Sequence, residues 1–372
     1  MKKGTSLYLD LVRFGAALAV VAEHFRERTR HLFDAFWGLY PRLSFYLEPL
    51  SHTAVAVFFV LSGYVIAHVM ETRERTIIEF AASRFGRLYS VVVPALVLTA
   101  ATNTLEVIAY PGFLDRVPIT HSGISPTMYY LGTAIFVNHI WLWPNLEPPN
   151  LIAFWSLTFE VAYYIAIALF VFTEGKTRVL GLAILGAVSG PAVVLLAPTW
   201  LLGYCVYRIA DRVKTNAGVS AFMWFGSIFL LMLCPLLNSG PPKYISMLNM
   251  PDPSLGHLLN AYATAICFAI NIVACNGISL NLKRILQPFS KLIRWLGSLT
   301  FALYLFHAPL LSFFLVYSLH DRASPAQALY MIGGTLFLVA TLGRFCEQSK
   351  GTYKRLLLTV MGRTTKPSQT MG

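Results

Sequence analysis

The stretch LDLVRFGAALAVVAEHF, residues 9–25, decides the fold class of this chain. It is apolar over almost the length that a helix needs to cross a bilayer, yet it contains Asp10, Arg13, Glu23 and His24. A charged side chain at mid-membrane costs about 2.5–3.5 kcal/mol on insertion scales. A helix that only anchored the chain would not carry such residues, so we expect one side of this helix to face a polar interior.

The spacing of these residues places three of them on one stripe of the helix. Arg13 and His24 are eleven residues apart, which corresponds to three turns plus about 20° and to about 16 Å along the axis. Asp10 precedes Arg13 by three residues, on the same face and within pairing reach. Ionisable groups isolated inside a membrane are functional candidates by default. The sequence therefore predicts a polar seam through the bilayer.

The composition independently assigns the chain to the integral membrane proteins. Of its 372 residues, 56% are hydrophobic and only 12% are charged, whereas soluble domains contain about 25% charged residues. The formal charge of +12 fits Lys and Arg collected on a cytoplasmic face, so we expect no nucleic-acid partner. All five cysteines lie in apolar runs without paired spacing, so we expect neither disulfides nor a metal site.

Continuous apolar runs of about 20 residues mark the expected membrane spans. They are 7–25, 52–70, 88–110, 151–173, 178–197, 219–238, 257–278, 297–319 and 326–346, with a shorter run at 198–210 after Pro198. The fold class that we expect is an all-α polytopic membrane protein with about ten transmembrane helices.

The distribution of basic residues predicts the orientation. With both termini cytoplasmic, the inside loops and the tail hold 20 of the 29 Lys and Arg, and the outside loops hold seven. A further span at 128–143 would move the basic loops 208–216 and 280–295 to the outside. We therefore expect a re-entrant or interfacial segment near 128–143, a membrane-embedded domain over 1–346 and a short basic cytoplasmic tail over 347–372.

Polar residues in the first half of the chain have two interpretations each. Ser62 and Gly63 are small, so either a neighbouring backbone or a ligand could approach closely there. Arg84 and Arg87 lie three residues apart at the start of a helix, and such a pair suits a pyrophosphate as well as lipid headgroups. His24, near the outer surface, suits a general base for a hydroxyl or an interfacial histidine without a function.

Two later helices also carry polar residues inside the membrane. Glu160 lies about a turn and a half into its span, and a buried carboxylate requires a partner such as Arg13 or a histidine. It could orient a base or hold helices together. His307 lies in an outward-going helix, with Tyr304 on its face and with Pro309 leaving a carbonyl free. We interpret this helix as the polar wall of a cavity.

Several enzyme motifs do not occur in the sequence, namely H-x4-D, G-x-S-x-G, the P-loop and H-E-x-x-H. Soluble-type glycerolipid acyltransferase, serine hydrolase, ATPase and metalloprotease chemistry are therefore disfavoured.

Five separated stretches resemble the acyltransferase-3 family of integral-membrane O-acyltransferases, many of which modify bacterial surface polysaccharides. The stretches are the LD-x-x-R-x10-H helix (9–24), FF-x-LSG (58–63), R-x-x-R-L-Y (84–89), WSL-x-x-E-x-x-x-Y (155–164) and S-x5-Y-L-x-H-x-P (298–309). They occur in the family's order and cover roughly residues 7–350.

The resemblance implies transfer of an acyl group, acetyl by default, from cytoplasmic acyl-CoA to a hydroxyl of a saccharide or glycoconjugate outside a bacterial inner membrane. It implies that Arg13 and His24 are essential and that Arg84 and Arg87 hold the CoA phosphates. We expect His24 to act as the general base and no metal to take part. The expected site residues are, as catalytic groups, His24, Arg13, Asp10 and Glu160; as CoA-binding groups, Arg84, Arg87 and Tyr89; and as walls of the substrate cavity, Ser62, Trp155, Ser156, Tyr304 and His307.

The sequence departs from the family pattern in the first helix. Leu11 and Phe14 stand where the family has glycines, and Glu23 precedes His24 where an apolar residue is usual. Two other classes of function also fit a bundle of this kind. One is a transporter or flippase of a lipid-linked sugar or other solute, against which we find no inverted repeat. The other is a sensor or scaffold that retains the fold without catalysis.

Overall fold

The computed structural model describes residues 1–30, 49–72, 74–111, 124–141, 146–210, 212–213, 215–237, 244–245, 250–251, 255–317 and 325–362. Its α-helices are α1 (Lys3–Thr29), α4 (Leu50–Thr72), α5 (Ile77–Ala109), α6 (Pro126–Ala134), α7 (Trp155–Phe172), α8 (Gly175–Ser189), α9 (Pro191–Ala210), α10 (Ala217–Leu233), α11 (Leu255–Gly277), α12 (Ser279–Leu286), α13 (Ser290–Tyr317) and α14 (Pro325–Val360). The short elements are the 3-10 helices η2 (Cys234–Leu237) and η3 (Gln287–Phe289) and an antiparallel pair of strands, β1 (Tyr244–Ile245) and β2 (Met250–Pro251).

The long helices confirm the expected fold class, an all-α polytopic membrane protein. Within the described ranges, nine helical stretches are long and apolar enough to cross a membrane. The apolar helix α8 has 15 residues, fewer than the roughly 20 that a full crossing requires. Within its described residues, the segment expected to be re-entrant or interfacial contains the nine-residue helix α6, which is too short to span.

The boundary between α8 and α9 differs from the one that the sequence predicts. We expected the break at Pro198, but α8 ends at Gly190, whose φ of +92° stops the helix, and α9 starts at Pro191. Pro198 lies inside α9. The hydroxyls of Tyr163 and Tyr262 donate to the carbonyls of Val193 and Leu195 on the preceding turn. Neighbouring helices thus satisfy backbone groups around this proline.

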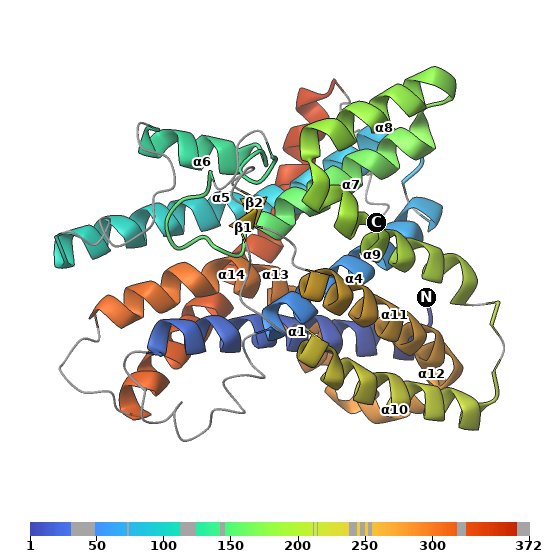
Figure 1. Cartoon of the computed structure of the whole chain (residues 1–372). Coiled ribbons are helices and arrows are strands. Elements are labelled where there is room, and N and C mark those ends of the chain that lie inside the picture. Colours follow the sequence, from blue (N-terminus) through green and yellow to red (C-terminus); the bar gives the residue numbers. More distant parts are fainter. Residues whose placement is uncertain are drawn as a thin grey trace, which may run out of the picture.

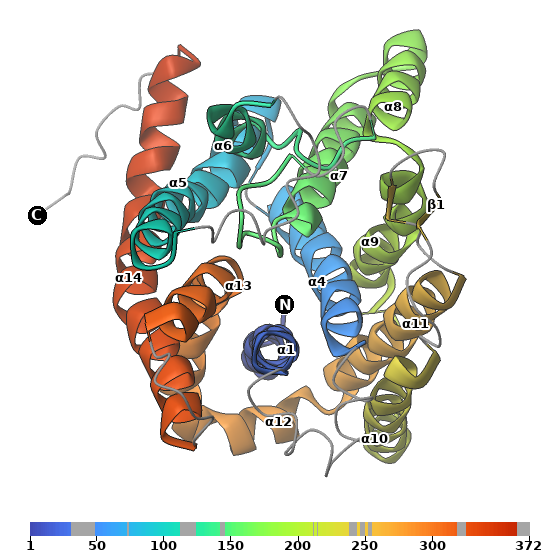
Figure 2. The ribbon, with the colours of Figure 1, turned by 60° about the vertical axis from the view of Figure 1, so that its left-hand side comes forward.

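The first helix, α1, runs through the middle of the bundle (Figures 1 and 2). It packs between α13 on one side and α4 on the other, and α12 crosses its N-terminal end. Beyond α13 lie α5 and α14, and beyond α4 lie α9, α11 and α10. The helix with the charged stripe therefore packs against α4, α12 and α13, while Leu11 and Leu18 on another face are exposed.

Glycines bring α4 and α9 into backbone contact. A Cβ added to Gly63 would lie 2.0 Å from the carbonyl oxygen of Trp200, and one added to Gly203 would lie 2.0 Å from that of Val60. Such close crossings are typical of small residues at helix interfaces in membranes. At Gly63 the neighbour that approaches is therefore a backbone.

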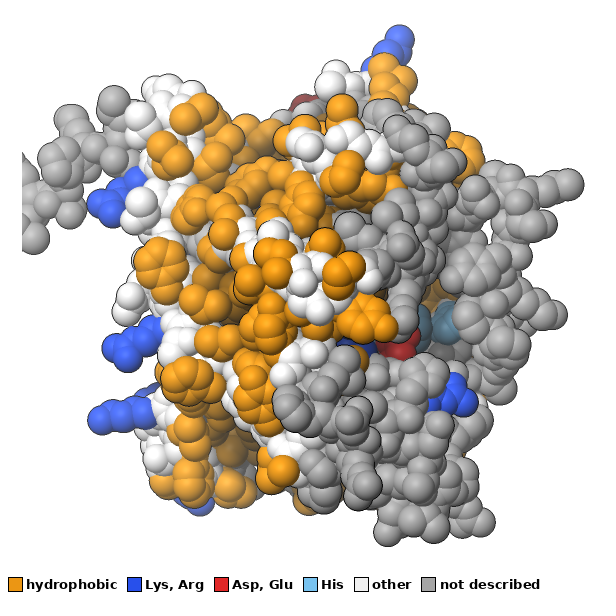
Figure 3. All heavy atoms as spheres, turned by 90° about the vertical axis from the view of Figure 1, so that its left-hand side faces the viewer, with side chains coloured by type: hydrophobic (Ala, Val, Ile, Leu, Met, Phe, Trp, Pro, Cys, Tyr) orange, Lys and Arg blue, Asp and Glu red, His pale blue; other side chains and the backbone are white. Residues whose placement is uncertain are grey.

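The outer surface of the bundle is strongly apolar. Figure 3 shows one face on which hydrophobic side chains cover most of the described surface, while Lys and Arg lie mainly toward its margins. On α10, the side chain of Phe222 is 80% exposed, and Phe225 and Phe229 are exposed on the following turns. Soluble monomers rarely expose contiguous apolar patches of this extent, so we assign this surface to lipid.

Candidate functional site

His24 and His307 form a direct contact in the interior of the bundle. Nδ1 of His24 lies 2.8 Å from Nε2 of His307, and the two rings stack at 5.0 Å with an interplanar angle of 12°. The His307 side chain is fully buried, and its Nδ1 lies 3.0 Å from the carbonyl oxygen of Leu303 one turn earlier. Both histidines were predicted as site residues, but their pairing was not.

A second pair explains why these histidines meet. Asp10 accepts a hydrogen bond from Arg294, which joins the N-terminal parts of α1 and α13. His24 follows Asp10 by 14 residues and His307 follows Arg294 by 13, so two parallel helices joined at the first pair also meet at the second, about 20 Å further along. Gly297 permits this packing, since an added Cβ would lie 3.0 Å from Cβ of Asp10.

The pairing of Asp10 corrects an expectation from the sequence. Asp10 lies within helical reach of Arg13, yet its carboxylate pairs with Arg294 of the neighbouring helix. Among the described residues, Arg13 has no hydrogen-bond or ion-pair partner. Its guanidinium lines two adjoining cavities instead.

The first of these cavities, the central cavity, has a volume of about 90 Å³ and lies among α1, α4, α5, α7 and α13. It contains most of the residues that we expected in the site. Its polar lining is formed by Arg13, Ser62, Arg84, Arg87, Ser156, Glu160, Tyr164, Thr300 and Tyr304.

The second cavity, the inner cavity, has a volume of about 290 Å³ and shares Arg13, Arg87 and Phe301 with the first. Its other charged residues form two ion pairs, Arg294 with Asp10 and Lys350 with Glu347. Arg13 and Arg87 are therefore the two charged residues of its lining that form no ion pair with a described carboxylate.

Glu160 has hydroxyl partners in place of the arginine or histidine that we expected. Its Oε1 accepts hydrogen bonds of 2.5 Å from Ser62 and from Tyr164, four residues later on α7. Nε1 of Trp200 donates to the Ser62 hydroxyl at 3.1 Å. This network joins α4, α7 and α9 and fixes the carboxylate at the wall of the central cavity. Hydroxyl donors satisfy a buried carboxylate without a cation.

Arg84 and Arg87 differ in their environments. The helix α5 starts at Ile77, so both arginines lie about two turns inside it and not at its start. Arg84 is buried and its Nη2 donates to Glu74 Oε1 at 2.9 Å, whereas Arg87 is exposed to the cavities. Thr76 caps the helix by accepting from the backbone of Glu79. This T-x-x-E capping box is the signal in the sequence that would have located the true start.

The Arg84–Glu74 pair leads to a stability prediction. Removing one member of a buried ion pair costs about 3–5 kcal/mol, whereas replacing both members by apolar residues is often neutral. We expect Glu74→Ala to lower the unfolding temperature in detergent, and Glu74→Ala/Arg84→Met to recover most of the loss. Thermal unfolding of the two variants tests this expectation. A double variant as unstable as the single one would show that the pair is not what the fold requires.

Five expected site residues lie outside the lining of the central cavity. Asp10 and His24 are described above, and the other three have the following contacts. The hydroxyl of Tyr89 donates to the carbonyl of Ala134 at the end of α6, at 3.1 Å. Trp155 packs edge-on against Phe159 and lies 6.4 Å from the ring of His52. His307 contacts His24, as described above.

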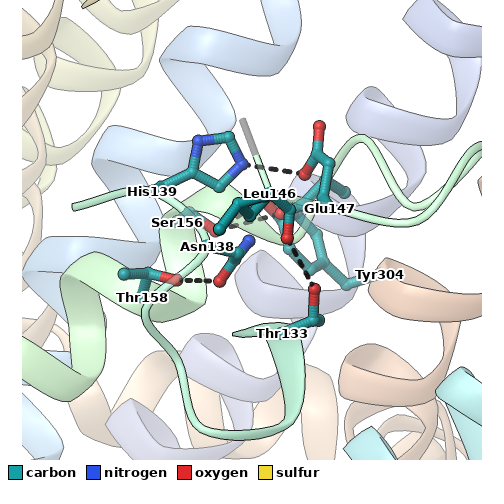
Figure 4. A network of polar contacts seen from close by, with 9 residues as sticks. Thr133, Asn138, His139, Leu146, Glu147, Ser156, Thr158 and Tyr304 are labelled. Carbon is teal, nitrogen blue, oxygen red and sulfur yellow. Dashed lines mark hydrogen bonds and ion pairs between the residues drawn. The ribbon is translucent and has the colours of Figure 1, made fainter. Parts of the chain in front are cut away.

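The segment after α6 folds back onto the start of α7 through a network of polar contacts (Figure 4). Thr158 donates to Asn138 at 2.7 Å, and Thr133 donates to the carbonyl of Leu146 at 3.2 Å. Nearby, the hydroxyls of Ser156 and Tyr304 are 2.7 Å apart. This last bond joins two residues of the lining of the central cavity, about one turn of α13 before His307.

A further polar network, not predicted from the sequence, holds the far end of α1. Arg28 donates to Asn150 at 3.1 Å, and Asn150 donates to Asn103 and to the buried Glu106 at 3.0 and 2.9 Å. Asn150 adopts a left-handed φ of +67°, which asparagine tolerates better than most residues. The network ties the last turn of α1, just after His24, to α5 and to the approach to α7.

One group of side chains in this region could hold a metal ion. Possible ligand atoms of Glu23, His24 and Glu27 lie within 4.8 Å of one another. Nδ1 of His24 faces His307, so only Nε2 would be available to such an ion.

The fold and the site define a polytopic membrane protein with a charged, cavity-lined interior. The family model described as an acyltransferase domain matches residues 6–344, nearly the whole chain. The chain therefore belongs to the acyltransferase-3 family, and the protein is a membrane acyltransferase. No curated protein and no solved structure matches it.

Proposed function

We propose that the protein transfers an acyl group, most simply acetyl, from cytoplasmic acyl-CoA to a hydroxyl of a saccharide or glycoconjugate on the outer side of a bacterial inner membrane. The observation that carries the proposal is the pair of guanidiniums, Arg13 and Arg87, which line two adjoining cavities and form no ion pair with a described residue. Cations left unpaired inside a membrane protein are costly unless a ligand neutralises them. The phosphates of CoA are anions suited to that role.

The arginines that we assign to the phosphates differ from the expected pair in one member, because Arg13 takes the place of Arg84. Arg84 is occupied by Glu74, so we assign the donor's anionic groups to Arg87 and Arg13. The thioester end then lies in the central cavity, between Glu160 and Tyr304. To reach His24, the acyl group has to pass the Ser156–Tyr304 hydrogen bond, which therefore opens when the donor binds.

In the proposed reaction, the imidazole of His24 takes the proton of the acceptor hydroxyl. The hydroxyl oxygen attacks the thioester carbonyl, a C–O bond forms and the C–S bond breaks. The CoA thiolate leaves toward the inner cavity and takes a proton from water. Because the reaction is a direct transfer, it requires no metal and no covalent acyl-enzyme.

The assignment of Arg87 predicts a weaker affinity for the donor when this residue is replaced. A hydrogen bond to a charged group contributes about 1.5–3 kcal/mol, so we expect Arg87→Ala to raise the KM for acetyl-CoA about 10- to 100-fold. Arg178→Ala is the matched control, because Arg178 donates to the Thr173 carbonyl at the α7–α8 turn, outside both cavities. The measurement is release of free CoA thiol from membranes. Equal KM values for the two variants would count against the proposed donor site.

The same cavities would suit a transporter of an anionic solute. The two functions differ in one product, because only transfer cleaves the thioester. Free CoA formed from acetyl-CoA in membranes of cells that express the protein, above the level in membranes that lack it, identifies transfer. Uptake of label without thiol release identifies transport.

A further inference from the structure

Both ring nitrogens of His24 are occupied in the structure. Nδ1 lies 2.8 Å from Nε2 of His307, and Nε2 lies 3.1 Å from Oε2 of Glu23, the adjacent residue. A general base requires a nitrogen with a lone pair that its substrate can reach. The partners of the two nitrogens determine which nitrogen that is.

His307 decides the tautomer of His24. The carbonyl oxygen of Leu303 can only accept, so the Nδ1 of His307 that faces it carries a proton. In the neutral ring, Nε2 of His307 is then an acceptor. Nδ1 of His24 must therefore donate to it, and the lone pair of neutral His24 lies on Nε2. The His307 side chain is fully buried.

Glu23 is the residue that contacts this nitrogen of His24. Nε2 of neutral His24 and a carboxylate oxygen both carry lone pairs, so one proton shared between them would stabilise their contact of 3.1 Å. The proton belongs either to an imidazolium beside a carboxylate or to a carboxylic acid that donates to the imidazole. Arg26 lies 3.9 Å from the other oxygen of Glu23 and holds the carboxyl group in place.

We propose that Glu23, His24 and His307 form a relay in which His307 sets the tautomer of His24 and Glu23 shares the proton of its reactive nitrogen. The relay deepens the proposed function and rests on His24 being its base. His307 and Glu23 are positioning residues, since neither has to touch the substrate.

The relay accounts for the position of the proton at each step of one catalytic cycle. Glu23 first withdraws from Nε2 as the carboxylic acid, which exposes the lone pair to the acceptor hydroxyl. Nε2 takes the hydroxyl proton while the C–O bond forms and the C–S bond breaks. Glu23 then releases its own proton to water and returns as the carboxylate beside the imidazolium. The resting pair again holds one proton.

The resting relay is testable without substrate, by ¹⁵N NMR of the full chain labelled at its histidine side chains. His24 signals are identified by their loss in His24→Gln. We expect Nδ1 of His24 to be protonated, and both His24 signals to shift in Glu23→Gln and in His307→Leu. His68→Gln is the matched control, because His68 is an intramembrane histidine that pairs with Tyr207, 3.1 Å away. An unprotonated Nδ1, or signals that neither variant shifts, would overturn the relay.

Kinetic measurements distinguish a positioning role of His307 from a role in folding. His307→Gln retains an acceptor oxygen for Nδ1 of His24, whereas His307→Leu does not. We expect His307→Leu to lower kcat for CoA release from acetyl-CoA about 10²–10⁴-fold with an unchanged KM, and His307→Gln to restore most of the loss. Equal kcat in the two variants would contradict the orienting role. If the spectra show the relay but His24→Gln retains wild-type turnover, the proposed function fails and the relay stands.

Discussion

Replacement of His24 by alanine is expected to reduce acyl transfer about 10²–10⁴-fold, the usual contribution of a positioned general base. The expectation rests on two features of this histidine. It lies in the central helix α1 at the end of a stripe that begins with Asp10 and Arg13, and its ring is held from both sides by His307 and Glu23.

The measurement is thiol release from acetyl-CoA in membranes, together with acyl groups found by mass spectrometry on surface glycans. His68→Ala provides the control for loss of an intramembrane histidine, since it removes the contact with Tyr207 between α4 and α9. We expect this control to retain turnover with an unchanged KM. Wild-type turnover in His24→Ala would end the account of this residue as the base.

The largest effect on folding is expected from Gly63→Ala. An added Cβ would lie 2.0 Å from the carbonyl oxygen of Trp200 and 2.9 Å from the backbone nitrogen of Tyr204. Both are backbone atoms of α9, so the contact can be relieved only by separating two helices. Overpacking of a well-packed interior typically costs about 1–3 kcal/mol, and we expect at least the upper end here. Most of the expressed protein should therefore fail to fold.

The same substitution should also reduce activity in the fraction that folds. Ser62, next to Gly63, donates to Glu160 and accepts from Trp200, and a shift of α9 breaks this network. Gly226→Ala is the control, because an added Cβ there meets no atom within 4 Å. Alanine stabilises a helix relative to glycine by about 1 kcal/mol, so this control should be as stable as the natural chain. Equal thermal stability of the two variants would contradict the close crossing.

The sequence predicted the features that depend on one helix at a time. Hydrophobic runs predicted the membrane bundle, because the bilayer sets the length and polarity of each span. The spacing of Asp10, Arg13 and His24 predicted a polar stripe, which the structure places in the centre of the bundle. The motif residues Ser62, Glu160 and Tyr304 line one cavity.

The features that depend on two helices could not be predicted in this way. Asp10 has a cation within helical reach, yet it pairs with Arg294, 284 residues away in the chain. His24 meets His307 only because α1 and α13 run in parallel at that register. Glu74 precedes α5 and neutralises Arg84, which changes the pair of arginines that remain for an anion. Partner choice depends on tertiary packing, and a single sequence does not give it.

The break between α8 and α9 illustrates a conflict between two local signals. Both Gly190-Pro191 and Pro198 can end a helix. The glycine takes a positive φ and stops α8, while Pro198 stays inside α9, where tyrosines from other helices donate to the carbonyls of the preceding turn. Membrane helices tolerate internal proline, so the glycine was the stronger signal.

We propose that the donor binds at the cytoplasmic end of the polar seam and that the acyl group reaches the acceptor at its outer end. The most direct test supplies radiolabelled acetyl-CoA to inverted and to right-side-out membrane vesicles that contain the protein and its native acceptors. We predict label on carbohydrate only in inverted vesicles, where Arg13 and Arg87 are accessible from the bath, and no label there with Arg13→Ala. Equal labelling in right-side-out vesicles would contradict the claim.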